Sequence, residues 1–230
     1  MKELFEHLLY FGVVVSVVGY EIGLWLKKKT NFSLFNPLLI AVIFVMGFLS
    51  LFHIQYEAYE ESASLLSYLL TPATVCLAVP LYEQLELLKK QYKAILFGVI
   101  SGMVSGLISI FLLSLLFHLN HTQYVTLLPK SITTAIGMGV SEEIGGNVTI
   151  TVAAIVVTGI LGNVIGEVVL RFFHIKEPIA KGIALGAASH AIGTSKAMEI
   201  GEVEGAMSSL SLAITGLLTV IAAPIFANFM

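Results

Sequence analysis

Eight long apolar runs, separated by short polar connections, restrict the folds that this sequence can adopt. A helix needs about 20 apolar residues to cross the hydrocarbon core of a bilayer, and most of the runs are close to that length. Lipid offers the backbone no hydrogen-bond partners, so we expect the runs to form helices within a bundle. They occupy approximately residues 8–26, 36–52, 65–82, 94–118, 127–145, 147–170, 179–197 and 206–229.

The composition also indicates a membrane protein. Of the 230 residues, 57% are hydrophobic and only 12% are charged, whereas about a quarter of a typical soluble domain is charged. A transmembrane barrel needs strands of alternating polarity, and these runs do not alternate. The lone Cys76 excludes an internal disulfide, and motifs for nucleotides, metals or nucleic acids are absent from the sequence. We therefore predict an all-α bundle of seven to eight spans that has no cofactor, no metal, no nucleic-acid partner and no enzymatic activity.

Basic residues gather in three of the connections. They lie at 27–29, at 83–93 and at 171–181, and cytoplasmic loops carry an excess of Lys and Arg. All three connections fall on one side of the membrane only if residues 127–145 enter and return as a re-entrant hairpin. The charges therefore predict a re-entrant segment there, with the N-terminus outside and the C-terminus inside the cell.

The runs divide into two repeats, residues 8–118 and 127–229, of a single membrane domain. The third run of each repeat is interrupted, by Thr71, Pro72, Thr74 and Pro80 in the first and by Ser189, His190, Gly193, Thr194 and Ser195 in the second. Inverted repeats with discontinuous helices that meet at mid-membrane are a recurring design of secondary transporters. We predict two discontinuous helices that run in opposite directions and meet at mid-membrane.

A second internal similarity links residues 131–145 and 189–201. Both segments carry Ala-Ile-Gly, and in both a Glu-Ile-Gly begins six residues after that glycine. This pattern is either a remnant of the repeat or a coincidence in glycine-rich sequence.

The most informative polar segment is Pro-Lys-Ser-Ile-Thr-Thr at 129–134. It places Lys130 beside the hydroxyls of Ser131, Thr133 and Thr134 in an otherwise apolar region. A charge at membrane depth normally faces a partner or a water-filled cavity, and an ammonium beside hydroxyls is suited to bind a carboxylate. The alternative is that Lys130 extends to the lipid headgroups.

Two further segments are candidates for the same site. Ser189, His190 and Thr194 lie in the middle of an apolar run, where His190 could contact an anion or carry a proton. The alternative is a histidine that stabilises the interruption of its own helix. Thr74 follows Pro72, so its hydroxyl could either bind substrate or satisfy a carbonyl that the proline leaves free.

Several stretches resemble the LrgB/CidB family of membrane proteins. They are N-P-L-L-I at 36–40, P-A-T-V-C-L-A-V-P-L-Y at 72–82, L-P-K-S-I-T-T at 128–134, A-S-H-A-I-G-T at 188–194 and G-E-V-E-G-A at 201–206. The ordered set covers most of the chain, although Ala135 stands where a proline is expected. The resemblance implies a fold with crossed broken helices, similar to cation/proton antiporters and bile-acid symporters.

The resemblance also implies two functional classes. One is movement of pyruvate, glycolate or glycerate, usually with a small LrgA-like membrane partner; the other is antiholin-like regulation of murein hydrolases and autolysis without transport. We expect a multi-pass carrier of small monocarboxylates in the bacterial cytoplasmic membrane, which works by alternating access. The glycine ladder Gly98, Gly102 and Gly106 permits close helix contact, within the bundle or across the homodimer that we expect.

Overall fold

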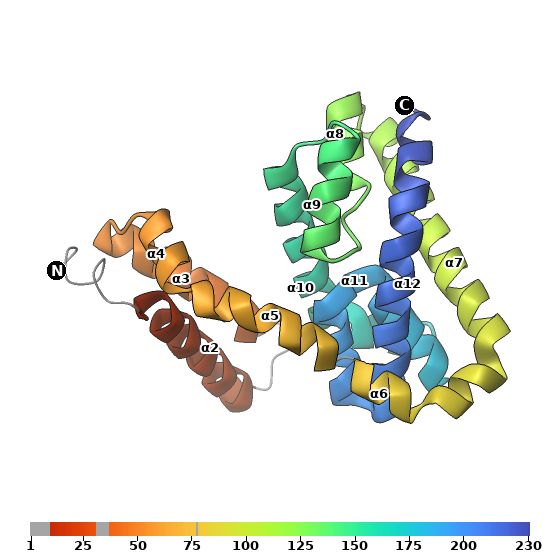
Figure 1. The fold of residues 1–230 in the computed structure, drawn as a ribbon, viewed down its shortest axis with the longest axis horizontal. Helices are drawn as coiled ribbons and strands as arrows, with labels where there is room; N and C mark the ends of the chain where they lie inside the picture. The colour runs from red at the N-terminus through yellow and green to blue at the C-terminus, as the bar shows by residue number, and fades with distance from the viewer. Residues whose placement is uncertain (1–9, 31–36, 77) are drawn as a thin grey trace. The chain divides into compact units, whose positions relative to one another are not determined.

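A computed structural model describes residues 10–30, 37–76 and 78–230, and this part of the chain is helical without strands. Contacts divide the chain into two units, Met1–Cys76 and Leu77–Met230 (Figure 1). The start of the first apolar run and Asn36 of the N-P-L-L-I motif lie outside the described residues. The predicted all-helical fold is confirmed.

The first unit consists of α2 (Phe11–Thr30), α3 (Pro37–Phe52), α4 (Tyr56–Ser62) and α5 (Ser64–Cys76). Phe11 and Val15 of α2 belong to one buried cluster with Val45 of α3. The hydroxyl of Ser62 accepts a hydrogen bond from the backbone N–H of Gly12 at 2.9 Å. This unit is therefore an antiparallel helix pair that is joined to the short α4 by a buried polar contact.

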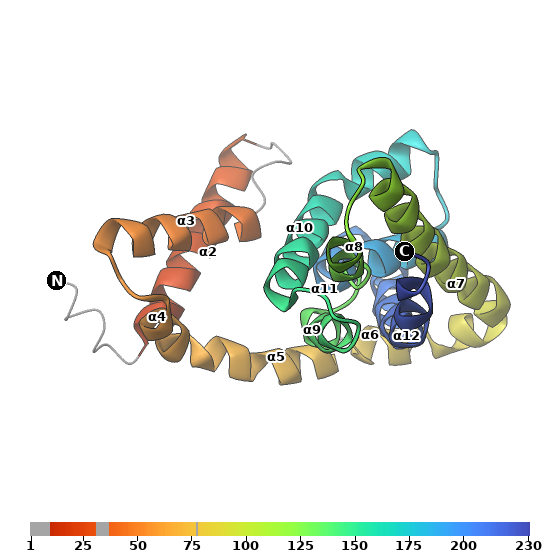
Figure 2. The same cartoon turned by 90° about the horizontal axis from the view of Figure 1, so that it is seen from above.

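Three helices of the second unit are long and apolar enough to cross a membrane, among the residues that the structure describes. They are α7 (Leu85–Leu116), α10 (Val148–Phe172) and α12 (Glu202–Ala227), and α12 lies between α10 and α7 in Figure 2. The short α6 (Ala78–Glu83) packs against α12. We call the end of this unit that holds residues 85–93 and 171–181 the basic end, and the opposite end, with residues 117–121 and 228–230, the far end.

Helix α8 (His121–Leu127), the non-helical residues 128–133 and α9 (Thr134–Glu143) form a hairpin, hairpin 1, that starts and finishes at the far end. At its base, Thr126 Oγ1 accepts from the backbone N–H of Asn147 at 2.8 Å. Nearer its turn, a Cβ built at Gly137 would lie 3.5 Å from the carbonyl oxygen of Pro129. Residues 127–145 therefore double back, as the charge pattern predicted.

The second hairpin, hairpin 2, is α11 itself (Pro178–Ile200). Its helical geometry is broken at Ser189 and His190, where His190 has φ 43° and ψ −139°. The first arm runs antiparallel to α10, because Leu185 lies against Gly166 and Ser189 lies against Gly162.

The second arm of hairpin 2 runs back along α10. Ile192 O accepts from Asn163 Nδ2 at 3.2 Å, and Lys196 pairs with Glu167 one turn further on. The interruption lies where the sequence predicted it, but the chain reverses there instead of continuing across the unit. The predicted crossing of this run with residues 65–82 involves both units and stays a prediction.

The reversal changes the predicted position of the C-terminus. Because α11 returns to the basic end, α12 begins there, beside Lys181, and finishes at the far end. At the far end, the backbone oxygen of Met230 lies 2.7 Å from Nδ1 of His121. The C-terminus is thus opposite the basic loops, and the prediction that both share one side was wrong.

The two Ala-Ile-Gly segments occupy equivalent places. Each begins the second arm of a hairpin, and each arm precedes a long helix, α10 or α12. Gly137 faces the carbonyl of Pro129 and Gly193 faces that of Leu185, and each partner is the residue eight positions earlier. The similarity between residues 131–145 and 189–201 therefore corresponds to a structural repeat of opposite orientation.

Candidate functional site

A partly open cavity of about 1060 Å³ lies in the second unit, along α7 and between the two hairpins. Hairpin 1 contributes Leu128 and Lys130–Ile132, whereas hairpin 2 contributes Ile183, Ala184, Ala187 and Ala188. Aligning the two Ala-Ile-Gly segments makes Ser131 equivalent to Ala187 and Ile132 equivalent to Ala188. Corresponding positions of the repeat thus line the cavity, and hairpin 1 gives it a positive charge, Lys130.

Two of the predicted site residues, Lys130 and Ser131, line this cavity. Both are half-buried, and Lys130 Nζ donates to Ser131 Oγ at 3.1 Å. In the described part of the chain, no carboxylate lies within ion-pair distance of this ammonium. The two remaining N–H groups of Lys130 are therefore free to bind an anion or water.

The other predicted residues of the first two segments have different positions. Thr133 precedes α9 as its N-cap but makes no side-chain capping bond, and Thr134 begins the helix. Both are half-buried beside the turn of hairpin 1 without lining the cavity. Thr74 belongs to α5 in the first unit, and its side chain lies outside the described residues.

Ser189, His190 and Thr194 lie at the turn of hairpin 2 and are buried. His190 Nε2 lies 3.0 Å from the carbonyl oxygen of Ile155 and therefore donates to it. Thr194 Oγ1 donates to His190 O at 3.0 Å and lies 2.9 Å from Ser208 Oγ. These groups fix the reversal of α11, and none of the three lines the cavity.

The turns of the two hairpins nevertheless approach each other. Lys130–Ile132 and Ala187–Ala188, which directly precede the two turns, line the same cavity, although the two segments enter from opposite ends of the unit. Lys130 thus faces the cavity while His190 lies behind it, against α10. The structure brings both predicted segments to the middle of the unit, and only the first contributes side chains to the cavity.

Sequence reasoning missed five hydroxyl residues of the cavity wall. Three of them lie on α7 and two on α12, at helical spacing. The available signal was the sequence around the glycine ladder, in which a serine follows each glycine three positions later. The missed residues are Ser101, Ser105, Ser109, Thr215 and Thr219.

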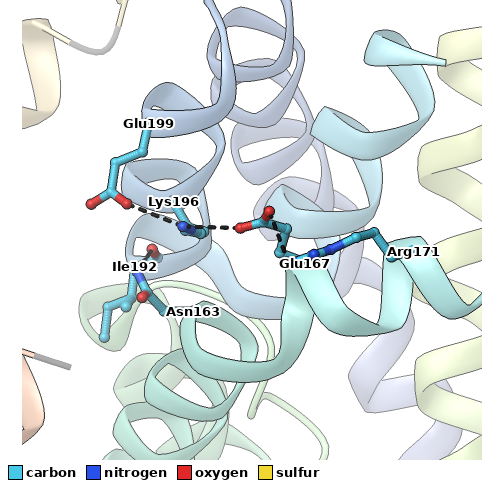
Figure 3. Close-up of polar contacts among 6 residues, drawn as sticks. All are labelled: Asn163, Glu167, Arg171, Ile192, Lys196 and Glu199. Atoms are coloured by element: carbon cyan, nitrogen blue, oxygen red, sulfur yellow. Dashed lines mark hydrogen bonds and ion pairs between the residues drawn. The ribbon is translucent and has the colours of Figure 1, made fainter. Parts of the chain in front are cut away.

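A charged network outside the cavity holds the second arm of hairpin 2 to α10 (Figure 3). Lys196 Nζ lies 3.3 Å from Glu167 Oε2 and 3.2 Å from Glu199 Oε2. Arg171 reaches the other oxygen of Glu167 at 3.2 Å. The first arm is held to α12 by Lys181 and Glu204, 3.7 Å apart. Ion pairs therefore hold both arms of hairpin 2 near the basic end.

Comparison with known proteins finds relatives over nearly the whole chain. A model of the LrgB-like family matches residues 16–229. Proteins of Bacillus cereus (strain B4264) and Bacillus anthracis (strain CDC 684 / NRRL 3495), both named "Antiholin-like protein LrgB", are 38% identical to this chain over 221 residues. In each case the similarity covers 96% of this chain and 96% of the relative. No solved structure matches the chain.

Proposed function

The chain belongs to the LrgB-like family of membrane proteins, and from this premise we propose that it carries small monocarboxylates across a bacterial cytoplasmic membrane. Pyruvate, glycolate and glycerate represent the substrate class. The chain acts as a carrier rather than as an enzyme, and exposes its cavity alternately to the two sides.

One observation supports the proposal more than any other. Lys130 places an ammonium without a paired carboxylate in the wall of a cavity at mid-height of a membrane unit. Transfer of an unpaired charge from water into an apolar region is costly, so such a lysine is stabilised when an anion enters. The cavity volume of about 1060 Å³ slightly exceeds the range for small-molecule sites, about 300–1,000 Å³. A three-carbon acid therefore fits together with water.

Hairpin architecture supports movement as well as binding. Hairpin 1 and hairpin 2 enter the unit from opposite ends, and residues next to both turns line the cavity. Displacement of one hairpin opens the cavity to one side while the other hairpin keeps it closed, which is the requirement for alternating access. We further propose a homodimer and a small LrgA-like membrane partner as the working assembly.

The test is uptake of radiolabelled pyruvate into proteoliposomes that contain the full chain. Lys130→Met removes the charge at similar length, and we expect it to reduce uptake to the background of protein-free liposomes. Lys90→Met is the matched control, because Lys90 is an exposed lysine of α7 that does not line the cavity. Wild-type flux at background, alone and with the LrgA-like partner, refutes transport; equal flux in wild type and Lys130→Met refutes the role of Lys130.

A second candidate function is regulation of murein hydrolase activity without transport. The observation in its favour is the name of the relatives, "Antiholin-like protein LrgB". A regulator of this kind needs an association surface but no charged cavity. A deletion strain complemented with Lys130→Met separates the two functions: normal autolysis control together with lost pyruvate uptake assigns the cavity to transport alone.

A further inference from the structure

One face of α7 consists of alternating glycines and serines that follow the cavity for most of its length. Gly98, Ser101, Gly102, Ser105, Gly106 and Ser109 all line it. The three serines are exposed, at intervals of four residues along the helix. At 1.5 Å per residue, the stripe from 98 to 109 is about 16 Å long, half the thickness of a bilayer core.

The serines present hydrogen-bond acceptors to the cavity. Ser101 and Ser105 donate to the carbonyls of Gly98 and Gly102, at 3.0 and 2.9 Å, and Ser109 donates to Ser105 O at 2.6 Å. Because each hydroxyl proton is used within the helix, the oxygen lone pairs remain free to accept from water. Lipid offers no donors to such a row of oxygens, whereas water in the cavity would supply them.

A second, independent observation indicates a polar occupant of the same cavity. Thr215 of α12 lines the cavity and is 2% exposed, and its hydroxyl has no hydrogen-bond partner among the described residues. A buried hydroxyl without a partner costs about 1–3 kcal/mol. Bound water or a ligand oxygen in the cavity would remove that cost.

The two ends of the cavity differ in the residues that line them. Toward the basic end its lining includes the exposed polar residues Gln91 and Glu177. Toward the far end it includes Leu107, Ile110 and Leu128, which belong to a buried apolar cluster with Tyr124 and Val125, each 0% exposed. The basic end is therefore the polar entrance, and the far end is apolar and packed.

We propose that the serine face of α7 and Thr215 form the wall of an aqueous path that leads from the basic end to Lys130, with the apolar cluster around Tyr124 as the closed gate. Cytoplasmic loops carry an excess of Lys and Arg, so the basic loops at this end place the opening on the cytoplasmic side. The path itself follows from the second unit alone. Only its cargo rests on the proposed function: the serine oxygens hydrate the carboxylate during its approach, and Lys130 binds it.

Cysteine accessibility tests the path in the full chain. The only native cysteine, Cys76, is replaced by serine, and single cysteines are introduced by Ser101→Cys, Ser105→Cys and Ser109→Cys. Ile100→Cys and Ile108→Cys are matched controls, since both residues are exposed on α7 but do not line the cavity. The probe is the membrane-impermeant trimethylammonium-ethyl methanethiosulfonate. A thiolate attacks its sulfenyl sulfur, forms a disulfide and releases methanesulfinate.

We expect the three serine-site cysteines to react in membrane vesicles that expose the cytoplasmic face. Apolar surroundings such as lipid raise the pKa of a thiol. Each pKa unit lowers the fraction of thiolate about tenfold, so the control cysteines should react at least ten times more slowly than the serine-site cysteines. Vesicles of the opposite orientation should give slow labelling at all five positions.

Equal rates at serine and isoleucine positions, or no labelling of the serine positions from the cytoplasmic side, overturn the proposal. Pyruvate flux in the Cys76→Ser background separates this failure from that of the proposed function. Labelling without flux, both alone and with the LrgA-like partner, refutes carboxylate transport and leaves the aqueous path in place. Flux without labelling refutes the path and leaves transport in place.

Discussion

A series of glycine-to-alanine substitutions tests whether the two hairpins are packed as the structure has them. A Cβ at Gly193 would meet the carbonyl oxygen of Leu185 and, at 2.7 Å, Ser189 Cβ. At Gly137 a Cβ would meet mainly the flexible end of Ile155, and at Gly139 it would meet nothing within 4 Å. The chemical change is the same at all three positions, while the space available differs.

The expected stabilities follow from two opposing terms. Alanine is favoured over glycine inside a helix by about 1 kcal/mol, and overpacking costs about 1–3 kcal/mol. At Gly193 the obstacle is backbone, so the upper cost applies, and the net loss is about 2 kcal/mol. Gly137→Ala should be close to neutral, because Ile155 can move aside. Gly139→Ala should gain about 1 kcal/mol, since it meets no obstacle.

Thermal unfolding of the purified protein in detergent measures the series. One kcal/mol corresponds to about 2–4 °C in a domain of 150–250 residues. Gly193→Ala should therefore unfold about 4–8 °C below wild type and Gly139→Ala about 2–4 °C above it. If Gly193→Ala matches or exceeds the wild-type Tm, the arms of hairpin 2 are not in contact and the reversal at His190 is wrong.

Two further substitution pairs probe hairpin 2. Lys196→Met should lower the free energy of unfolding by about 1 kcal/mol, and Arg171→Met by less than about 0.5 kcal/mol. The difference is expected because the Arg171 side chain is 75% exposed and that of Lys196 only 17%. Equal unfolding midpoints for the two variants would contradict the network in Figure 3. His190→Gly should be more stable than His190→Ala by about 1 kcal/mol, since φ of 43° strains any residue with a Cβ. Both variants lose the hydrogen bond to Ile155, so the difference between their denaturation curves reports the cost of the backbone conformation at residue 190. If His190→Ala were the more stable variant, residue 190 would not adopt this conformation.

The helical class and the return of residues 127–145 could be predicted from sequence because both depend on local physics. Run length and charge distribution act through the bilayer, without knowledge of any tertiary contact. The basic clusters of the second unit, around Lys90 and Lys176, predicted which ends share a side. To place both clusters on one side, one segment between them had to be re-entrant. The segment chosen has the clearest polar turn, Pro-Lys-Ser-Ile-Thr-Thr.

The reversal within α11 could not be predicted in the same way. Ser189-His190 contains neither glycine nor proline, so it carries no turn signature. The conformation is held by contacts with distant segments, namely His190 with Ile155 O and Ser189 with Gly162. A sequence shows the polar residues of such a turn but not the carbonyl that receives the imidazole N–H. The position of the interruption was therefore correct, and the direction of the chain after it was not.

The electrostatics of the two hairpins explain why the functional hypothesis depends so strongly on one side chain. In hairpin 2 the C-terminal end of the first arm meets the N-terminal end of the second at Ser189 and His190. In hairpin 1, α8 ends at the base, beside Asn147, so only the N-terminus of α9 lies at the turn. A helix carries about half a positive charge at its N-terminus and half a negative charge at its C-terminus, so the dipoles largely cancel at the turn of hairpin 2, whereas α9 adds a partial positive charge at the turn of hairpin 1. Nε2 of His190 is bonded to the carbonyl oxygen of Ile155, so it donates no hydrogen bond toward the cavity. Among the described residues that line the cavity, Lys130 is the only cationic one, so the proposed selection of anions depends mainly on that ammonium.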